Sequence, residues 1–435
     1  MNNTTKLSPW LWVPSLYFAE GLPYFMVNVI SVILFKNMGM SNGDLALYTG
    51  MLYLPWVIKP LWSPFVDIIK TKRWWIISMQ ILMSVSFVLI AFSLPSPPSE
   101  LISSGQVSVS LFKIVLILFW ITAFASATHD IAADGYYMLA LKAHEQSIFV
   151  GIRSTFYRLS SIFGQGVLVV IAGVLETRTG NVPKAWFITL MLASLIFLTL
   201  TIFHLFIMPR PLEDSEGENH SVKDVFSEFI EVFISFFKKK NILIAMLFML
   251  LFRLPESFLV KMLNPFLLDS KDVGGLGLST QNIGLIYGTI GVIALTIGGV
   301  LGGLAVSKWG LRKLLWPMAL SLALPCSAFL YLSIVQTDSL WVISSCVLFD
   351  QFGYGFGFTA YLLYLLNFSE GKFKTAHYSI CTAFMALSMM LPGMVAGYLQ
   401  EWLGYTNFYW MIMFCCLATI AVTALIKVDV NYGKK

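Results

Sequence analysis

The stretch Leu111–Leu139, LFKIVLILFWITAFASATHDIAADGYYML, decides the fold class of this chain. Its first part is almost entirely aliphatic and aromatic, and a helix of about 20 such residues crosses roughly 30 Å of hydrocarbon. Its second part nevertheless places His129, Asp130 and Asp134 within six residues. The stretch therefore predicts a membrane-spanning helix that exposes a polar face to something other than lipid.

Apolar runs of this kind recur along the whole chain. Of the 435 residues, 57% are hydrophobic and 12% are charged, and the mean hydropathy is +0.78. Backbone groups inside lipid must bond to one another, and runs this long and continuous are typical of helices, not of barrel strands. The sequence predicts an all-α membrane protein with twelve transmembrane helices, at about 11–35, 45–66, 74–94, 110–141, 148–174, 186–208, 242–268, 281–306, 312–335, 339–367, 375–399 and 405–427.

Basic residues predict the orientation, because lysine and arginine collect on the cytoplasmic side. If the N-terminus is internal, the internal loops hold Lys70, Lys72, Arg73, Lys238, Lys239, Lys240, Lys308, Arg312, Lys313, Lys372 and Lys374. Both termini are therefore expected in the cytoplasm. The first run carries Glu20 and Pro23, so we expect it to be the first span and not a cleaved signal. The net charge of +5 reflects this bias, and we expect no nucleic-acid partner.

The hydrophilic segment near the middle divides the chain into halves of six spans. We expect halves at 1–208 and 241–435, joined by a cytoplasmic linker at 209–240. Helical spacing of apolar residues from Val222 to Phe237 predicts an amphipathic helix in the linker, more plausibly a tether than a regulatory segment. The halves also echo each other, because Glu20 precedes Asn28 and Glu256 precedes Asn264 by the same separation of eight. Repeated halves with a site between them are typical of transporters.

Several motifs resemble a known family. The six-plus-six pattern with GGLAVSKWGLRK, residues 302–313, resembles the major facilitator superfamily, although Ser307 stands where that loop signature has a carboxylate. The conformational loop residues would be Asp67, Arg73, Lys308 and Arg312. SATHDIAADGYYMLAL, TAYLLYLLNFSEGKFKTAHYSICTAF and KPLWSPFVD resemble AmpG-type muropeptide permeases and the related acetyl-CoA transporters. His129 departs from this pattern, in which glutamine precedes the first aspartate.

The resemblance implies a location, a substrate class and an energy source. It implies a multi-pass protein of the bacterial inner membrane that imports a cell-wall amino sugar or muropeptide, driven by a proton gradient and without a cofactor. We expect a monomer whose partners are the small substrate and the lipid bilayer. Two alternatives stay open: a carrier of another solute, such as an acetyl-CoA-like molecule, a siderophore or an exported drug, and a membrane-bound acyltransferase that uses His129. The five cysteines show no metal-ligand spacing, and we expect no metal site.

The charges of spans 4 and 5 are the first candidates for a site. Asp130 and Asp134 are four residues apart and share a helix face, and both carboxylates would not ionise easily together in a cavity of low dielectric. We assign them to proton coupling, with Asp130 the deeper; the alternative for Asp134 is a structural pair with Arg153. Lys59 is expected to extend to the cytoplasmic surface. Substrate-binding candidates here are His129, Arg153, Tyr157, Arg158 and Gln165.

Spans 1, 7 and 10 supply the remaining candidates. Glu20, Glu256 and Asp350 join the proton-coupling set, and Gly21 with Pro23 predicts a kink beside Glu20. A structural Arg253–Glu256 pair is the alternative for Glu256. The further substrate-binding candidates are Tyr24, Asn28, Arg253, Lys261, Asn264 and Gln351, which offer hydrogen bonds, aromatic surface and cations.

Overall fold

The computed structural model describes residues 8–141, 143–211, 214, 222–429 and 432–433, and only the backbone at 67–68, 103, 143–144, 146–148, 150 and 222–228. The expected N-terminal residues 1–7, linker residues 212–213 and 215–221 and the last two residues lie outside this description. The described residues form helices and connecting loops with no strand, as the sequence predicts.

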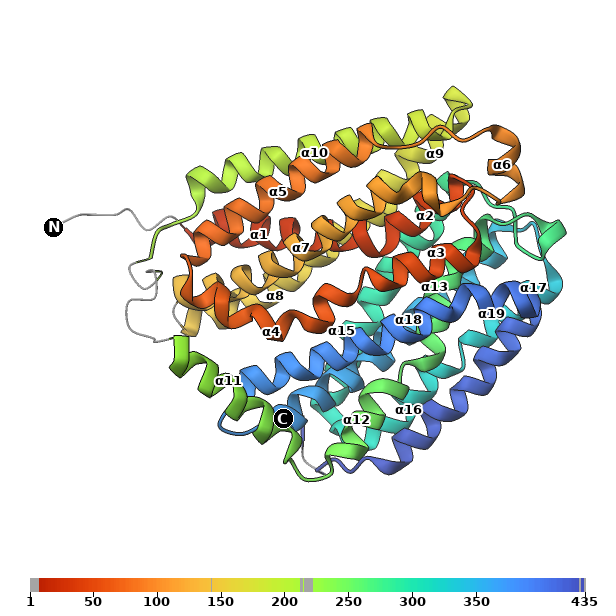
Figure 1. The fold of residues 1–435 in the computed structure, drawn as a ribbon. Coiled ribbons are helices and arrows are strands. Elements are labelled where there is room, and N and C mark those ends of the chain that lie inside the picture. The colour runs from red at the N-terminus through yellow and green to blue at the C-terminus, as the bar shows by residue number, and fades with distance from the viewer. Residues whose placement is uncertain (1–7, 142, 212–213, 215–221, 430–431, 434–435) are drawn as a thin grey trace.

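The first ten α-helices lie together in the upper part of Figure 1, coloured from red to yellow-green. Several spans consist of two or three consecutive helical pieces. In chain order the elements are α1 (Pro9–Phe25), η1 (Met26–Ile30), α2 (Ser31–Asn37), α3 (Asn42–Met51), α4 (Leu54–Ile68), α5 (Lys72–Phe92), α6 (Ser99–Ser104), η2 (Val109–Phe112), α7 (Lys113–Ala140), α8 (Ala143–Ser161), η3 (Ile162–Leu168), α9 (Val169–Thr179) and α10 (Val182–Ile207).

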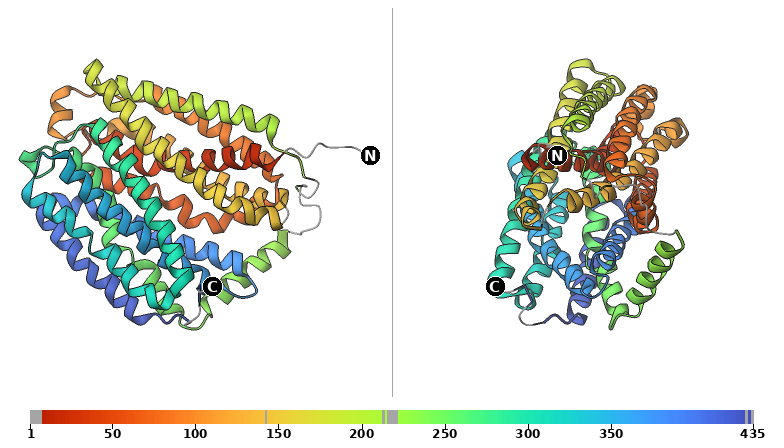
Figure 2. Two further views of the ribbon diagram at one scale, coloured as in Figure 1. Left: turned by 180° about the vertical axis from the view of Figure 1, so that it is seen from behind. Right: turned by 90° about the vertical axis from the view of Figure 1, so that its left-hand side faces the viewer.

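The later helices lie beside them, coloured from green to blue in Figures 1 and 2. These elements are α11 (Val222–Phe237), α12 (Ile242–Leu251), α13 (Leu254–Leu268), η4 (Lys271–Val273), α14 (Thr280–Leu285), η5 (Ile286–Gly291), α15 (Val292–Trp309), α16 (Leu311–Ala323), α17 (Cys326–Val335), α18 (Leu340–Ser369) and α19 (Lys374–Leu425). The end of the bundle near Asn42 is called the Asn42 end, and the opposite end, near α11, is called the linker end.

The helices are consistent with the twelve predicted spans. Within the described residues, nine helices are long and apolar enough to cross a membrane. The α3–α4 segment and α18 are not among these nine. The helix α19 is counted as one of them, although Gly404, with φ 72° and ψ 163°, divides it into two helical parts. That conformation interrupts a helix and is readily adopted only by glycine.

Prolines explain where several spans are interrupted. Pro23 lies inside α1, and the chain passes into the π-helix η1 three residues later. Pro55 and Pro255 stand in the first turn of α4 and α13, each after a break that separates the helix from the one before. A proline has no N–H for the preceding turn, so the helix kinks or restarts there. The helix stays regular at Glu20 itself, and its geometry changes only at Met26, so the kink predicted beside Glu20 stays a prediction.

Glycines allow the closest contacts between the two groups of helices. At Gly288 in η5, an added Cβ would lie 2.0 Å from the carbonyl oxygen of Gln165 in η3. At Gly397 in α19, it would lie 1.8 Å from the carbonyl oxygen of Asn42 in α3. Both crossings therefore require glycine, because any side chain would collide with the facing backbone.

The amphipathic helix predicted in the linker exists as α11. Its Val232 and Phe236 are buried, and Phe236 stacks on Phe384 of α19 with ring centroids 6.2 Å apart. Ile230, Ile234 and Phe237 remain exposed. The helix therefore packs one apolar edge on the later group of helices and leaves a second edge open at the linker end.

Candidate functional site

Two ion pairs fix the carboxylates of span 4. Asp130 of α7 pairs with Lys59 of α4, and Arg153 Nη2 of α8 lies 2.8 Å from Asp134 Oδ1. The prediction that Lys59 extends to the surface is therefore wrong, because a carboxylate within reach in the interior stabilises the ammonium group better than a long path to water. Asp134 is paired with Arg153, as the alternative interpretation of this residue predicted.

Tyr17 of α1 completes the Asp134 side of this cluster. Its hydroxyl donates to Asp134 Oδ1 at 3.1 Å, and the Arg153 guanidinium lies 4.4 Å from the centre of its ring. The ring of Tyr137 lies on the same guanidinium at 5.1 Å. Arg153 is thus held by a carboxylate and two aromatic faces, which leaves it poorly placed to bind a substrate as predicted.

Glu20 joins the same cluster from α1. It is buried, and its carboxyl group lies close enough to those of Asp130 and Asp134 to interact with them electrostatically. Neighbouring carboxyl groups in the interior are more stable when one of them carries a proton, because two like charges repel each other there. Glu20 Oε2 has no hydrogen-bond partner among the described residues. The group of Glu20, Lys59, Asp130, Asp134 and Arg153 is called the acid cluster below.

His129 points to different partners from its neighbour Asp130. Its Nε2 lies 3.0 Å from Gln80 Nε2 of α5, and Gln80 Oε1 lies 3.0 Å from His204 Nδ1 of α10. His204 in turn contacts Ser15 Oγ at 3.0 Å. This chain of polar side chains lies among helices of the first group, and it favours a structural role for His129 over the predicted contact with substrate.

The charges of spans 7 and 10 form a second group. Arg253 Nη2 donates to the Tyr354 hydroxyl at 2.5 Å, and its guanidinium lies 4.6 Å from the centre of the Phe358 ring. Glu256 is fully buried, and neither of its carboxyl oxygens has a hydrogen-bond partner among the described residues. Arg253 therefore does not form the structural pair with Glu256 that was the predicted alternative.

Asp350 and Gln351 lie close to Glu256. Gln351 Nε2 donates to Asp350 Oδ2 at 2.9 Å, and both side chains are buried. Asp350 is near enough to Glu256 for the two carboxyl groups to interact electrostatically. Gln351 is thus occupied by Asp350, while Glu256 is the carboxyl group with unused acceptors.

A small cavity lies between η1, the turn that joins α3 to α4, α13 and η5. Its volume is about 20 Å³, and its polar lining is Asn28, Tyr53, Ser257, Lys261, Asn264 and Tyr287. The cavity brings together the two asparagines that echo each other in the sequence, although they are far apart along the chain. Lys261 Nζ donates to Thr49 Oγ1 at 2.7 Å.

A group of aromatic rings lies beside Asn28, one of the lining residues, whose Nδ2 donates to the Tyr24 carbonyl. Tyr24 contacts Trp56 with ring centroids 5.2 Å apart and Tyr157 with centroids 6.5 Å apart, and all three are half-buried. Flat, half-buried rings with polar edges suit the stacking of a sugar. The predicted substrate contacts Tyr24 and Tyr157 thus lie together.

The remaining predicted residues lie apart from the cavity lining. Arg158 faces α15, where a Cβ at Gly299 would lie 3.2 Å from its Nη2, and no ion pair involves it among the described residues. Gln165 Nε2 donates to Ser161 Oγ at 2.6 Å in the η3 crossing. Both residues border the later helices, but neither lines the cavity.

The predicted loop residues lie at the linker end. Arg73 Nη2 donates to the Leu205 carbonyl at 2.6 Å and so ties α5 to α10. Lys308 lies over the ring of Trp309 at 5.0 Å, and Arg312 is exposed. Asp67 lies in α4, but its side chain is outside the described part of the chain.

A polar network that the sequence did not predict joins the two groups of helices at the Asn42 end. Lys36 Nζ lies 2.5 Å from Asp269 Oδ1 and donates to Asn42 Oδ1 at 2.8 Å. Asn42 Nδ2 donates to Gln400 Oε1 at 2.7 Å and to Asp269 Oδ2 at 3.0 Å. Tyr405 donates to the same Asp269 oxygen at 2.6 Å. Its partners are up to 363 residues apart, so no local pattern reveals it.

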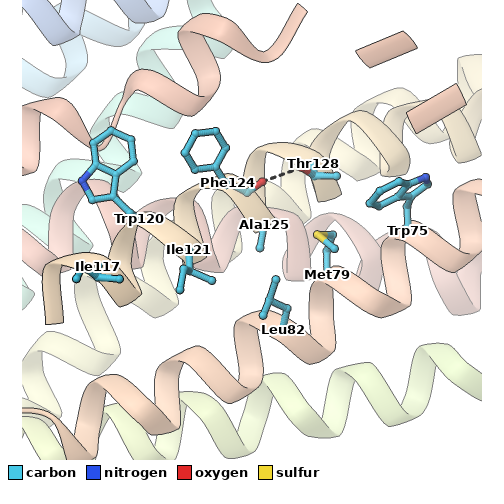
Figure 3. A pocket seen from close by; sticks show the side chains of 9 residues that line it. All are labelled: Trp75, Met79, Leu82, Ile117, Trp120, Ile121, Phe124, Ala125 and Thr128. Atoms are coloured by element: carbon cyan, nitrogen blue, oxygen red, sulfur yellow. Dashed lines mark hydrogen bonds between the residues drawn. The ribbon is translucent and has the colours of Figure 1, made fainter. Parts of the chain in front are cut away.

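An apolar groove of the bundle is lined by none of the residues of these groups. It measures about 490 Å³ and lies between α5 and α7, lined by Trp75, Met79, Leu82, Ile117, Trp120, Ile121, Phe124, Ala125 and Thr128 (Figure 3). Ile117 and Phe124 are exposed on the outer surface of the bundle. An apolar groove of this kind faces the lipid, and it contains none of the predicted site residues.

The arrangement has a counterpart among known proteins. A profile of the major facilitator superfamily matches residues 15–372. The chain belongs to the major facilitator superfamily. Members of this superfamily are transporters, so the chain is a transporter and not an enzyme, and the acyltransferase alternative falls.

Curated superfamily relatives cover nearly the whole chain at low identity. A putative transporter AmpG 4 from Rickettsia conorii is 26% identical over 94% of this chain and 96% of its own length. The anhydromuropeptide permease of Escherichia coli K12 is 23% identical over 90% of this chain and 74% of its own. The resemblance to AmpG-type proteins is thus confirmed, at a distance that leaves the substrate of this chain open.

Solved superfamily structures share the fold. A D-xylose–proton symporter superposes with a TM-score of 0.71 over 98% of this chain and 99% of its own, at 16% identity. The nucleoside transporter NupG superposes with a TM-score of 0.66 over 96% of this chain and 98% of its own, at 12% identity. These similarities support the all-α transporter fold predicted from the sequence.

Proposed function

We propose that this transporter couples an inward flow of protons to the import of a cell-wall-derived amino sugar or muropeptide across a bacterial inner membrane. The names of its relatives, AmpG and anhydromuropeptide permease, support the substrate class. The observation that carries the proposal is the acid cluster, in which the buried Glu20 lies near the ion pairs Lys59–Asp130 and Arg153–Asp134.

The charges of the acid cluster favour the uptake of one proton. Two cations, Lys59 and Arg153, face three carboxyl groups, so a single shared proton makes the cluster electroneutral. Uncompensated charge inside a membrane costs several kcal/mol or more, so the protonated form is favoured when water is excluded. Loss of that proton leaves one negative charge, which favours a conformation in which the cluster meets water.

The connections between the helix groups suggest how the conformation changes. We assign the moving halves to residues 1–208 and 241–435 and place the Asn42 end outside the cell, following the distribution of basic residues. The network of Lys36, Asn42 and Asp269 would then hold the external end shut. Rocking of one half against the other would break it and open the site outward.

The substrate side of the site combines aromatic rings with few charges. Tyr24, Trp56 and Tyr157 suit the faces of sugar rings, and Asn28 and Asn264 suit acetamido and hydroxyl groups. A CoA ester would need several cations for its phosphates, whereas Arg153 and Lys59 are already paired with carboxylates. This favours the amino sugar over the acetyl-CoA-like alternative.

Uptake into proteoliposomes tests the proposal. The purified transporter should accumulate a radiolabelled anhydromuropeptide, chemically unchanged, when the outside is acidic, and a protonophore should abolish the accumulation. Unlabelled anhydromuropeptides and free N-acetylated sugars should compete, whereas CoA esters should not. Accumulation without a pH gradient would contradict proton coupling, and competition by CoA esters alone would contradict the substrate class.

A further inference from the structure

We propose that Lys261, together with Asn28 and Asn264, forms a subsite for a single carboxylate of the substrate that carries an N–H or O–H donor beside it. The inference rests on the proposed function and deepens it, because it names the cation that recognises the acidic part of the substrate. The subsite is the small cavity between η1, the turn that joins α3 to α4, α13 and η5.

Lys261 and Arg253 are both buried cations without an ion pair among the described residues, but of the two only Lys261 lines the cavity. Lys261 is 6% exposed, its Nζ donates to the neutral Thr49 hydroxyl, and the ring of Tyr53 lies 5.9 Å away. No ion pair involves it among the described residues, unlike Lys59 and Arg153. A buried ammonium group without a counter-ion is strongly unfavourable, and a carboxylate supplied by the ligand would stabilise it.

Two amide oxygens face the same space without partners. Asn28 Oδ1 and Asn264 Oδ1 are buried and accept no hydrogen bond from any described residue. Asn28 is fixed by its Nδ2, which donates to the Tyr24 carbonyl at 3.1 Å. Unused buried acceptors suit ligand donors, and the remaining N–H groups of Lys261 suit a ligand acceptor. The lining is therefore complementary to a carboxylate with a donor next to it.

The size of the cavity limits which part of a substrate enters. About 20 Å³ accommodates one water-sized group, so one oxygen of the carboxylate enters, and the rest of the substrate with its sugar ring stays at the mouth of the cavity. The ring must therefore lie outside the subsite, against the half-buried Tyr24 and Trp56. A substrate that carries several phosphates does not match one lysine in a space this small.

Arg158 is the competing cation. It also lacks an ion pair among the described residues, but it is only half-buried and lies against Gly299, outside the lining of the cavity. It has no neighbouring pair of unused amide oxygens. Substitution of each cation separately therefore distinguishes the two positions.

Equilibrium binding of a matched acid and ester tests the subsite. N-acetylmuramic acid and its uncharged methyl ester are compared by thermal shift and by titration on the full-length transporter in detergent. The acid should bind the unsubstituted protein at least about tenfold more tightly than the ester, because a charge-assisted hydrogen bond is lost in the ester. Equal binding of acid and ester, or binding of neither, overturns the subsite without any variant.

The variants locate the effect. Lys261→Gln should bring the acid down to the affinity of the ester, whereas Arg158→Gln should keep the preference for the acid. Lys261→Met serves as a second variant if the glutamine form does not fold, and melting without ligand checks each protein. A preference that survives loss of Lys261, or that disappears only with Arg158→Gln, overturns the assignment.

The uptake assay separates this inference from the proposed function. If anhydromuropeptides are not accumulated but the acid preference still depends on Lys261, the proposed function is wrong and the carboxylate subsite stands. If anhydromuropeptides are accumulated and the acid and its ester bind alike, the transport function stands and the subsite is wrong.

Discussion

Lys36 Nζ of α2 lies 2.5 Å from Asp269 Oδ1, directly after α13, and this ion pair joins the two groups of helices at the Asn42 end. Both side chains are mostly buried, with 12% and 14% exposed. The carboxylate also accepts from Asn42 and Tyr405, so it is the common acceptor of the network. Its position makes it the contact whose loss should most affect closure of that end.

Asp269→Asn should shift the population towards a form that is open at the Asn42 end. Loss of one or two kcal/mol at a closed interface changes such a population roughly 5- to 30-fold. The buried Met40, replaced by cysteine in a background without the five native cysteines, reports the opening as faster labelling by a membrane-impermeant maleimide.

Asp338→Asn is the matched control for this experiment. Its pair with Lys271 is also 2.5 Å long, but both residues lie in the later half of the chain, in η4 and in the loop before α18. Their side chains are 38% and 91% exposed, and exposed pairs contribute little. Labelling of Met40→Cys should stay at its original rate in this variant. Equal labelling in both variants would show that the Asp269 contact does not hold the end shut.

Asp130→Asn should abolish gradient-driven accumulation while exchange of labelled for unlabelled substrate continues. An amide cannot release a proton, but it can occupy the same space and keep the binding site intact. Accumulation and exchange are measured side by side in proteoliposomes. If the asparagine form still concentrates substrate, the coupled proton belongs to Glu20, Glu256 or Asp350.

The double variant Lys59→Gln with Asp130→Asn separates coupling from folding. Asp130→Asn alone leaves Lys59 without its carboxylate, which costs about 3–5 kcal/mol for a fully buried pair and less for this partly exposed one. The double variant should therefore melt at a higher temperature than Asp130→Asn and still fail to accumulate substrate. Recovery of accumulation in the double variant would contradict the proton role of Asp130.

Gly288→Ala should lower the melting temperature and reduce transport. Its new methyl group would lie 2.0 Å from the Gln165 carbonyl oxygen, which forces η3 and η5 apart. Gly303→Ala in the adjoining α15 is the control, because no atom lies within 4 Å of its Cβ position. That variant should melt unchanged or slightly higher, since alanine favours helix by about 1 kcal/mol over glycine. Equal effects of both changes would refute a tight crossing at Gly288.

Reporter fusions test the orientation. A reporter after Lys435 should give a cytoplasmic signal, and one inserted at Ser99, at the start of α6, should give an external signal. The physical basis is the collection of lysine and arginine in alternate loops. Identical signals from the two positions would refute the assigned topology and the external position of the Asn42 end.

The sequence predicted the helical class and most span positions because lipid imposes a local requirement. Every span must be apolar and must bond its own backbone, so the information lies within each segment. Interruptions were harder to predict: the break before Pro255 was not anticipated, and after Pro23 the helix passes into the π-helix η1, a geometry that the sequence did not indicate. A proline marks a weak point, but packing against neighbours decides which irregular geometry follows.

The sequence also identified polar residues that are too costly to be accidental inside a membrane, but it did not determine their partners. Asp130, Asp134 and Lys261 stand out in apolar runs, whereas the pairing of Lys59 with Asp130 and the contact of His129 with Gln80 appear only when helices pack. The same holds for Asn28 and Asn264, whose spacing from Glu20 and Glu256 suggested a repeat and whose common cavity is tertiary.

One physical reason explains why the sequence identified the polar residues but not their partners. The cost of placing a charge or an unpaired backbone group in hydrocarbon belongs to each segment by itself, and the amino-acid sequence alone therefore determined the membrane class, the approximate spans and the candidate polar residues. The benefit of an ion pair or a shared hydrogen bond depends on the distance between two segments. Only tertiary packing, through crossings such as Gly288 on Gln165, decided that Lys36 meets Asp269 and that Lys261 has no carboxylate among the described residues.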